Sequence, residues 1–207
     1  MNIAVLASGL GSTLQAVMDR IESGDLNARV VLVLGNNSRA QALERARNAG
    51  VPVVHISGAT HPDDDERDRA IAEALVAADT DLVLLAGYMK QLGPTVLARF
   101  EGRILNTHPS LLPKYGGHGF YGRRVHEAVI EAGDTETGAT VHVVTRDYDA
   151  GPVVGQIRVP VRASDTVDTL EANVKKAEQR LLVEVLRDWA AQMEDQGPRM
   201  AKVMPGD

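Results

Sequence analysis

The sequence predicts an α/β fold with a mostly parallel, mixed sheet flanked by helices. Its first half repeats one pattern: a short β-branched or leucine-rich run, then a turn, then a stretch rich in alanine, glutamate and arginine. Polar residues seldom interrupt the short runs, which is typical of parallel strands covered on both faces. A chain of 207 residues, 44% of them hydrophobic, can bury one sizeable core. We therefore expect a single domain over residues 1–192 and a loose tail over 193–207.

The elements follow from this pattern in order. Apolar runs predict strands over Ile3–Ala7, Val30–Leu34, Val51–Ile56, Leu82–Leu85, Ile104–Asn106, Thr140–Val144 and Val153–Val159. Glycine, proline, serine and aspartate mark the ends of helices predicted over 12–22, 39–48, 63–78, 91–99, 121–132 and 166–192. The acidic run Asp63–Glu66 should cap and open the third helix, because carboxylates near a helix N-terminus are favoured by its dipole.

Composition and charge exclude several classes of protein. Lys and Arg number 22 against 28 Asp and Glu, and this net charge of −6 argues against a nucleic-acid partner. The chain has no cysteine, so it has no disulfide, thiolate metal site or cysteine nucleophile. Because the sequence shows neither a targeting segment nor a long apolar span, we expect a cytoplasmic protein without a membrane partner.

A glycine-rich turn, Ser8–Thr13, follows the first predicted strand and opens the first helix. Unpaired backbone N–H groups and the helix dipole favour an anion at such a place. A dinucleotide-binding turn would need glycine where Leu14 stands, and an acid near Gly35–Asn37. The turn therefore either binds a phosphate or needs its glycines for geometry alone.

The densest group of polar residues, Asn106–Gly117, follows a buried strand at the edge where open α/β sheets bind ligands. His108 can exchange a proton near neutral pH, and Asn106 lies on the same side of an extended chain, where it can donate to an oxyanion. Asp149, in a turn between the last two strands, could hold His108 in its protonated form. The alternatives are a hydrogen-bonded loop histidine beside a turn-forming asparagine, and an Asx turn at Asp149.

The remaining histidines point to no further site. His55 and His142 lie in apolar strands and His61 in an acidic loop, which favours structural or solvent-exposed roles. His126 begins a segment that fails the zinc-protease pattern at Ile130, so no metal site is expected.

Four segments together, Ser8–Thr13, Leu85–Met89, Asn106–Tyr115 and Asp149–Pro152, resemble the phosphoribosylglycinamide formyltransferase family of folate-dependent enzymes in purine synthesis. The resemblance extends to about residue 190. It implies a Rossmann-like formyltransferase fold and transfer of a formyl group from 10-formyltetrahydrofolate, the cosubstrate, to the amine of glycinamide ribonucleotide without a metal. These two small molecules would be its partners, as a monomer or a homodimer.

The motif Asn-x-His-Pro-Ser-Leu-Leu-Pro is shared with formyltetrahydrofolate deformylases and, less closely, with methionyl-tRNA formyltransferases. Hydrolysis of formyl-folate is therefore an alternative, as is a phosphate-binding module without turnover. Chain length favours the transferase, because deformylases carry an extra N-terminal domain and the tRNA enzymes a C-terminal one.

The resemblance also implies roles for individual residues. The catalytic residues would be Asn106, His108 and Asp149, the substrate phosphate would bind at Gly11, Ser12 and Thr13, and the ribose hydroxyls at Glu178. The folate pocket would include Met89, Lys90, Gln91, Leu92, Thr145, Arg146, Asp147 and Tyr148.

The sequence departs from the family pattern at three places. Thr13 stands where several relatives have asparagine, and Asp64 where some have an arginine near the folate tail. Asp64 should not bind the carboxylates of that tail, because like charges repel, which leaves Lys90 and Arg67 as the nearest candidates. The segment Gly116–Arg124 is longer than in some members.

Overall fold

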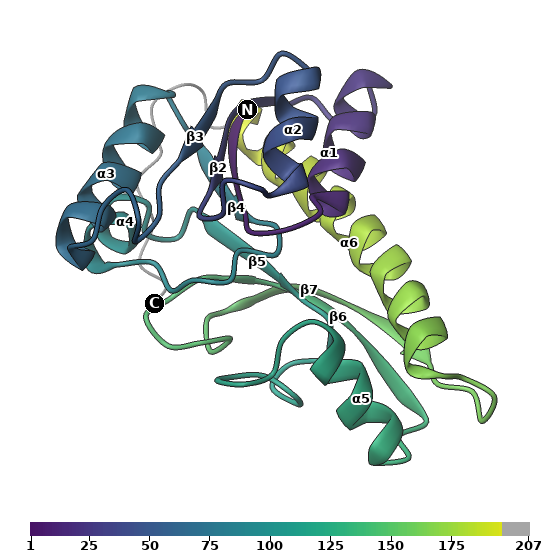
Figure 1. Cartoon of the computed structure of the whole chain (residues 1–207). Helices are drawn as coiled ribbons and strands as arrows, with labels where there is room; N and C mark the ends of the chain where they lie inside the picture. The colour runs from purple at the N-terminus through teal and green to yellow at the C-terminus, as the bar shows by residue number, and fades with distance from the viewer. Residues whose placement is uncertain (196–207) are drawn as a thin grey trace, which may run out of the picture. The chain divides into compact units, whose positions relative to one another are not determined.

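The computed structural model describes residues 1–195, with seven strands and six helices among them. In chain order these are β1 (Asn2–Ala7), α1 (Ser12–Glu22), β2 (Arg29–Gly35), α2 (Gln41–Asn48), β3 (Val53–His55), α3 (Asp64–Ala77), β4 (Leu82–Leu85), α4 (Pro94–Arg99), β5 (Ile104–His108), α5 (Arg123–Glu131), β6 (Glu136–Val143), β7 (Val153–Pro160) and α6 (Val167–Asp195) (Figure 1). Every predicted element is present. The predicted tail overlaps α6 at residues 193–195, and its remainder lies outside the described residues.

The strands are hydrogen-bonded in the order β3-β2-β1-β4-β5-β6-β7, which confirms the predicted mixed α/β sheet. The chain divides into two compact units. The first is Met1–Leu105 with the chain from Leu186 onward, and the second is Asn106–Val185. Strand β5 runs from one unit into the other, so that its last three residues belong to the second.

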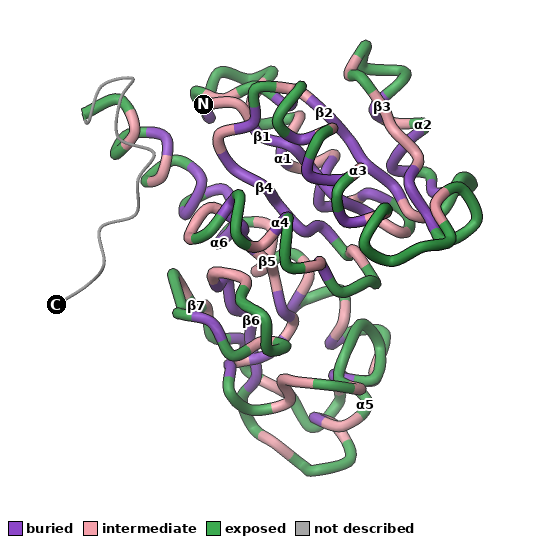
Figure 2. The backbone as a smooth tube through the Cα atoms, turned by 90° about the vertical axis from the view of Figure 1, so that its left-hand side faces the viewer, coloured by how far each residue is buried: buried purple, intermediate pink, exposed green. Residues whose placement is uncertain are grey.

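The first unit is built on parallel strands. β1 pairs with β2 and β4, and β2 pairs with β3, all in parallel. Ile3–Ala7 and Leu82–Leu84 are fully buried, and Figure 2 shows most of β1, β2 and β4 in the colour of buried residues. This burial explains the unbroken apolar runs of the sequence.

Helices α3 and α4 of the first unit lie side by side (Figure 1), and two aspartates of the α3 region organise their beginnings. Asp63 caps α3 by accepting a hydrogen bond from the Glu66 N–H at 2.8 Å, which confirms the expected role of the acidic run. The buried Asp68 accepts from the backbone N–H of Thr95 at 2.6 Å. Helix α4 therefore begins later than predicted, at the proline of its first turn, where a missing N–H costs nothing.

The second unit contains the antiparallel pair of β6 and β7. Its core is formed by Val129, Ala139, Val159, Leu170 and Val174. Strand β6 begins at Glu136, four residues before the predicted start at Thr140. The prediction missed these residues because they include Gly138, and glycine is a poor strand former. A Cβ atom at Gly138 would lie 2.0 Å from the carbonyl oxygen of Ile157.

Among the described residues, no helix is both long and apolar enough to cross a membrane.

Candidate active site

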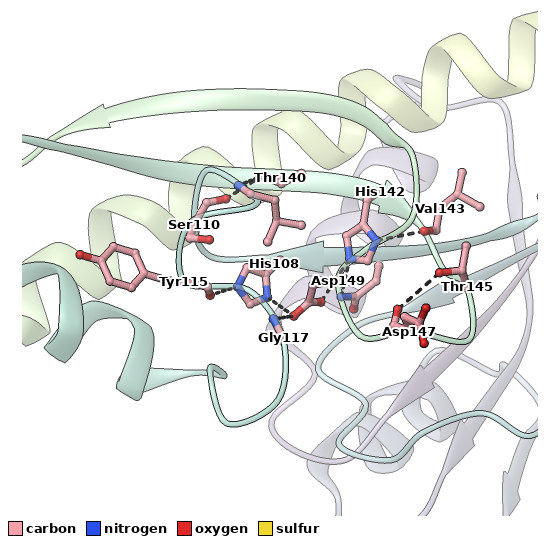
Figure 3. A network of polar contacts seen from close by, with 12 residues as sticks. His108, Ser110, Tyr115, Gly117, Thr140, His142, Val143, Thr145, Asp147 and Asp149 are labelled. Carbon is pink, nitrogen blue, oxygen red and sulfur yellow. Dashed lines mark hydrogen bonds and ion pairs between the residues drawn. The ribbon is translucent and has the colours of Figure 1, made fainter.

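The second unit brings the three predicted catalytic side chains together around a residue that the sequence did not single out, His142. Nδ1 of His108 lies 3.5 Å from one carboxylate oxygen of Asp149, and Nε2 of His142 lies 3.4 Å from the other. The amide nitrogen of Asn106 lies 3.1 Å from Nε2 of His142. Figure 3 shows the carboxylate between the two imidazoles. All three ionisable side chains are nearly buried, with exposed fractions of 5% for His108, 10% for Asp149 and 3% for His142.

Backbone carbonyls determine which ring nitrogen of each histidine carries the proton. Nε2 of His108 lies 2.7 Å from the carbonyl oxygen of Tyr115, and Nδ1 of His142 lies 3.0 Å from that of Val143. A carbonyl oxygen only accepts, so these two nitrogens are the donors of the neutral rings. Nδ1 of His108 and Nε2 of His142 are then the nitrogens that can gain a proton, and both face Asp149.

Asp149 is held as an ionised carboxylate. Burial acts to raise its pKa, but the nearby imidazoles of His142 and His108 and the N–H of Gly117 at 2.9 Å together bring the pKa below its usual range. Its backbone lies in the left-handed region, with φ 53°. Asparagine and aspartate tolerate this conformation better than most residues do.

Burial is also the largest influence on the pKa of His108. Removal from water lowers the pKa of its imidazole, and the opposing effects of the Asp149 charge and the Tyr115 carbonyl do not restore it. Burial therefore disfavours the protonated form of His108, whereas Asp149 favours it, as the sequence led us to expect. A proton gained at Nδ1 would form an ion pair with Asp149.

Glu178 lies on the other side of β5. The hydroxyl of Thr107, between Asn106 and His108, donates a hydrogen bond to the Glu178 carboxyl at 2.9 Å. Burial raises the pKa of Glu178, and the Thr107 hydrogen bond and Lys175 counter it only in part. Alternation along the strand thus separates Thr107 and Glu178 from Asn106 and His108.

The predicted phosphate-binding residues lie in the first unit, at the beginning of α1. Gly11 is the residue before the helix, in the left-handed region with φ 71°, and Ser12 and Thr13 are its first two residues. A Cβ atom at Gly11 would lie 2.7 Å from the Cα atom of Ala42. The geometry of the turn alone therefore requires glycine at this position, whether or not a phosphate binds.

The predicted folate-binding residues come from both units. In the first, the N–H of Met89 donates to the Ser8 hydroxyl at 2.7 Å, and that hydroxyl donates to the Asn36 side chain at 2.6 Å. Lys90, Gln91 and Leu92 follow Met89 in the segment that leads to α4, and Leu92 is buried.

In the second unit, Thr145, Arg146, Asp147 and Tyr148 form the turn after β6, where the Tyr148 ring is half exposed. Asp64, which we expect not to bind the folate tail, is the first residue of α3. It pairs with Arg67, one of the two cations considered for that tail.

Sequence reasoning missed three contributors to the site: His142 and two backbone groups, the Tyr115 carbonyl and the Gly117 N–H. A signal for His142 exists in hindsight, since a histidine in a buried strand needs a polar partner. No cluster of three or more His, Asp or Glu side chains suited to a metal ion is found in residues 1–195.

Comparison with known proteins identifies the family. The model of a family described as formyl transferase matches residues 1–186. The chain belongs to the formyl transferase family. The resemblance inferred from the sequence is thereby confirmed.

Two bacterial members of the formyl transferase family are similar to this chain over most of its length. Phosphoribosylglycinamide formyltransferase of Haemophilus influenzae is 41% identical over 185 residues, which is 89% of this chain and 85% of that protein. The protein of the same name from Mycobacterium tuberculosis (strain H37Rv) is 46% identical over 182 residues, 87% of this chain and 81% of the relative.

The crystal structure of glycinamide ribonucleotide transformylase 1 from Symbiobacterium toebii matches with a TM-score of 0.86 and 40% identity, over 93% of this chain and 88% of that one. The Rossmann-like formyltransferase fold expected from the sequence is confirmed.

Proposed function

We propose that this formyl transferase moves the formyl group of 10-formyltetrahydrofolate to the primary amine of glycinamide ribonucleotide, a step of purine biosynthesis. The observation that carries the proposal is the cluster in which ionised Asp149 lies between His108 and His142, with Asn106 on His142. The names of the relatives support the choice of substrates. Hydrolysis of formyl-folate is not favoured, because no relative described above carries that name.

In the reaction, the amine nitrogen attacks the formyl carbon, and the electron pair of the C=O bond moves to oxygen. The tetrahedral intermediate collapses with cleavage of the bond to folate N10. One proton leaves the amine and one is gained by N10, so the products are the formylated nucleotide and tetrahydrofolate. The protein must stabilise the oxyanion and transfer the proton.

Asn106 can stabilise the oxyanion. One hydrogen of its amide group is directed to His142, and the second is left to donate to the oxyanion. The Nε2–H of His108 is a second donor for the same oxygen. A proton gained at Nδ1 strengthens that donor, and Asp149 stabilises the resulting imidazolium.

Asp149 transfers the proton: its ionised carboxylate can accept the proton that leaves the amine and pass it to N10. The first N–H groups of α1, at Gly11–Thr13, bind the phosphate, and Glu178 accepts hydrogen bonds from the ribose hydroxyls. Folate binds at Met89–Leu92 and Thr145–Tyr148. The enzyme works in the cytoplasm on small molecules and not on nucleic acid or membranes, in keeping with its net charge of −6.

An assay of formyl-folate consumption with and without glycinamide ribonucleotide tests this proposal. A transferase consumes 10-formyltetrahydrofolate only when the nucleotide is present and yields one formylated nucleotide per tetrahydrofolate. Equal consumption without the nucleotide, with release of formate, would establish the hydrolase instead. No consumption in either case, with phosphate binding retained, would establish a non-catalytic module.

A further inference from the structure

Both ring nitrogens of His108 are engaged within the protein. Nε2 donates to the Tyr115 carbonyl at 2.7 Å, Nδ1 faces Asp149, and the residue is only 4% exposed. A histidine that acts on a substrate must give up one of these partners. Asp149 belongs to the proposed chemistry, so the exchangeable partner is the Tyr115 carbonyl. Its oxygen is of the same chemical type as the oxygen of a formyl group.

The backbone of Tyr115 is held in an unusual conformation. Its φ of 54° lies in the left-handed region, which a tyrosine adopts only where its surroundings impose it. Just before it, the buried Ser110 hydroxyl donates to the carbonyl of Lys114 at 2.6 Å. The Thr140 hydroxyl of β6 in turn donates to the Ser110 carbonyl at 2.6 Å (Figure 3). These two bonds fix the segment that precedes Tyr115, from Ser110 to Lys114.

The side chain of Tyr115 also fixes the position of this residue, through a hydrogen bond to Asp134. Its hydroxyl donates to Oδ2 of Asp134 at 2.8 Å, and Lys114 Nζ donates to the same carboxylate at 2.7 Å. The ring packs against the apolar core of the second unit and lies 5.8 Å from the ring of Phe120. Neither Lys114 nor Asp134 touches His108 in any described contact, so their effect on it must pass through Tyr115.

We propose that the Tyr115 carbonyl occupies on His108 the position of the substrate's formyl oxygen, and that Asp134, by anchoring the Tyr115 side chain, sets how readily the carbonyl leaves. Asp134 and Tyr115 are then positioning residues of the active site. This inference rests on the proposed function, because the competing ligand is a formyl oxygen. A formyl-folate must displace the carbonyl, so its apparent affinity is reduced by the fraction of protein in which the carbonyl is bound to His108.

A weakened anchor should therefore strengthen the binding of a formylated folate and leave that of an unformylated one unchanged. Tyr115→Phe removes the hydrogen bond to Asp134 while it keeps the ring in the core. Loss of one such bond should lower the Kd of 10-formyltetrahydrofolate, measured without the nucleotide, by up to about fivefold. The Kd of tetrahydrofolate, which has no formyl oxygen, should stay as in the wild type.

The contact itself is tested without folate, by 15N NMR of protein labelled in its histidines. His108→Gln identifies the His108 signals. In the wild type they should show the Nε2–H form, and in Tyr115→Phe and Asp134→Asn they should shift toward a mixture of the two ring forms. Glu136→Gln is the matched control, because it removes an exposed ion pair with Arg158 only two residues from Asp134. It should change neither the NMR signals nor either Kd.

Unchanged His108 signals in both variants, or equal changes in the two Kd values, would overturn the inference. A wild-type protein that transfers no formyl group to glycinamide ribonucleotide, yet shows the NMR response, would instead refute the proposed function and leave the anchored contact established.

Discussion

The amide of Asn106 and the imidazole of His142 fix each other's orientation. Because the Val143 carbonyl places the proton of neutral His142 on Nδ1, its Nε2 can only accept, and Asn106 must direct its amide nitrogen, not its oxygen, toward the ring. The orientation of the proposed oxyanion donor thus depends on a histidine that need not touch the substrate.

His142→Phe is expected to lower kcat while leaving the KM for the nucleotide close to that of the wild type. The ring fills the same buried space but no longer accepts from Asn106, whose amide group can then turn its oxygen toward the oxyanion. Loss of one oxyanion donor costs about 10²- to 10³-fold, which sets the upper limit of the effect, and steady-state kinetics measure it. A wild-type kcat in folded His142→Phe would remove His142 from the mechanism.

Asp149→Asn should lower turnover by about two to four orders of magnitude with little loss of stability. Asparagine has the size of aspartate and tolerates φ near 53°, so the turn should be preserved while the charge is removed. His108→Ala should lose a similar amount, and the double variant little more, since residues that act as a unit are not additive. Turnover, nucleotide affinity and melting temperature of all three variants provide the check. Near-normal turnover in folded Asp149→Asn would contradict the proton relay.

Gly11→Ala should destabilise the first unit, whereas Gly9→Ala in the same turn should not. A Cβ atom at Gly11 would lie 2.7 Å from Ala42, and alanine there would have to adopt the left-handed backbone conformation of Gly11. A Cβ atom at Gly9 would meet nothing within 4 Å. Backbone strain alone costs about 1–3 kcal/mol. Thermal unfolding of the two variants measures the difference. Equal melting temperatures would show that the turn is more adaptable than described.

Stability should fall as the pH decreases through about 6.5, in part because of His126. This residue of α5 is buried, and its Nδ1 has no hydrogen-bond partner. Burial lowers its pKa, and the opposing charge of Glu171 does not restore it, so the unfolded chain gains a proton at a pH where the folded protein does not. Stability is thus complete above the unfolded pKa and decreases below it.

In His126→Leu this decrease should be smaller, and at pH 8 the variant should be equal to the wild type or about 1 kcal/mol more stable. Melting temperatures at pH 5 and pH 8 test both expectations. Val129→Ala, in the same helix and core, is the control that should lower stability equally at both pH values. If His126→Leu follows the wild-type pH curve, the buried imidazole is not the group that titrates.

Sequence patterns predicted the fold well because the signals were local. The helix predicted at about 12–22 is present as Ser12–Glu22, since the glycine-rich turn before it marks its start. Predictions were less accurate where contacts between distant parts of the chain determine the ends of a strand. Strand β6 starts before Thr140 because a strand passes close to Gly138, and β5 continues past Asn106 to His108. No local propensity contains this information.

The candidate site was predictable only in its side chains with familiar chemistry. Asn106, His108 and Asp149 carry functional groups that a sequence displays. The Tyr115 carbonyl and the Gly117 N–H are backbone groups, and every residue has a carbonyl, so their part in the site depends on the conformation of one loop. His142 has a recognisable side chain, yet its apolar neighbours suggested a structural role that its contacts with Asn106 and Asp149 do not support.

Strand β5 places Asn106 and His108 toward one face and Thr107 toward the other, where it meets Glu178. A side-chain period of two therefore directs adjacent residues to different parts of the proposed site: Asn106 and His108 to the formyl group, and Thr107 to Glu178, the proposed ribose ligand. Insertion of a single residue ahead of Asn106 would exchange the two faces and abolish both functions at once, even though every functional residue would still be present. The spacing between residues is thus as much a part of this enzyme's specificity as their identity.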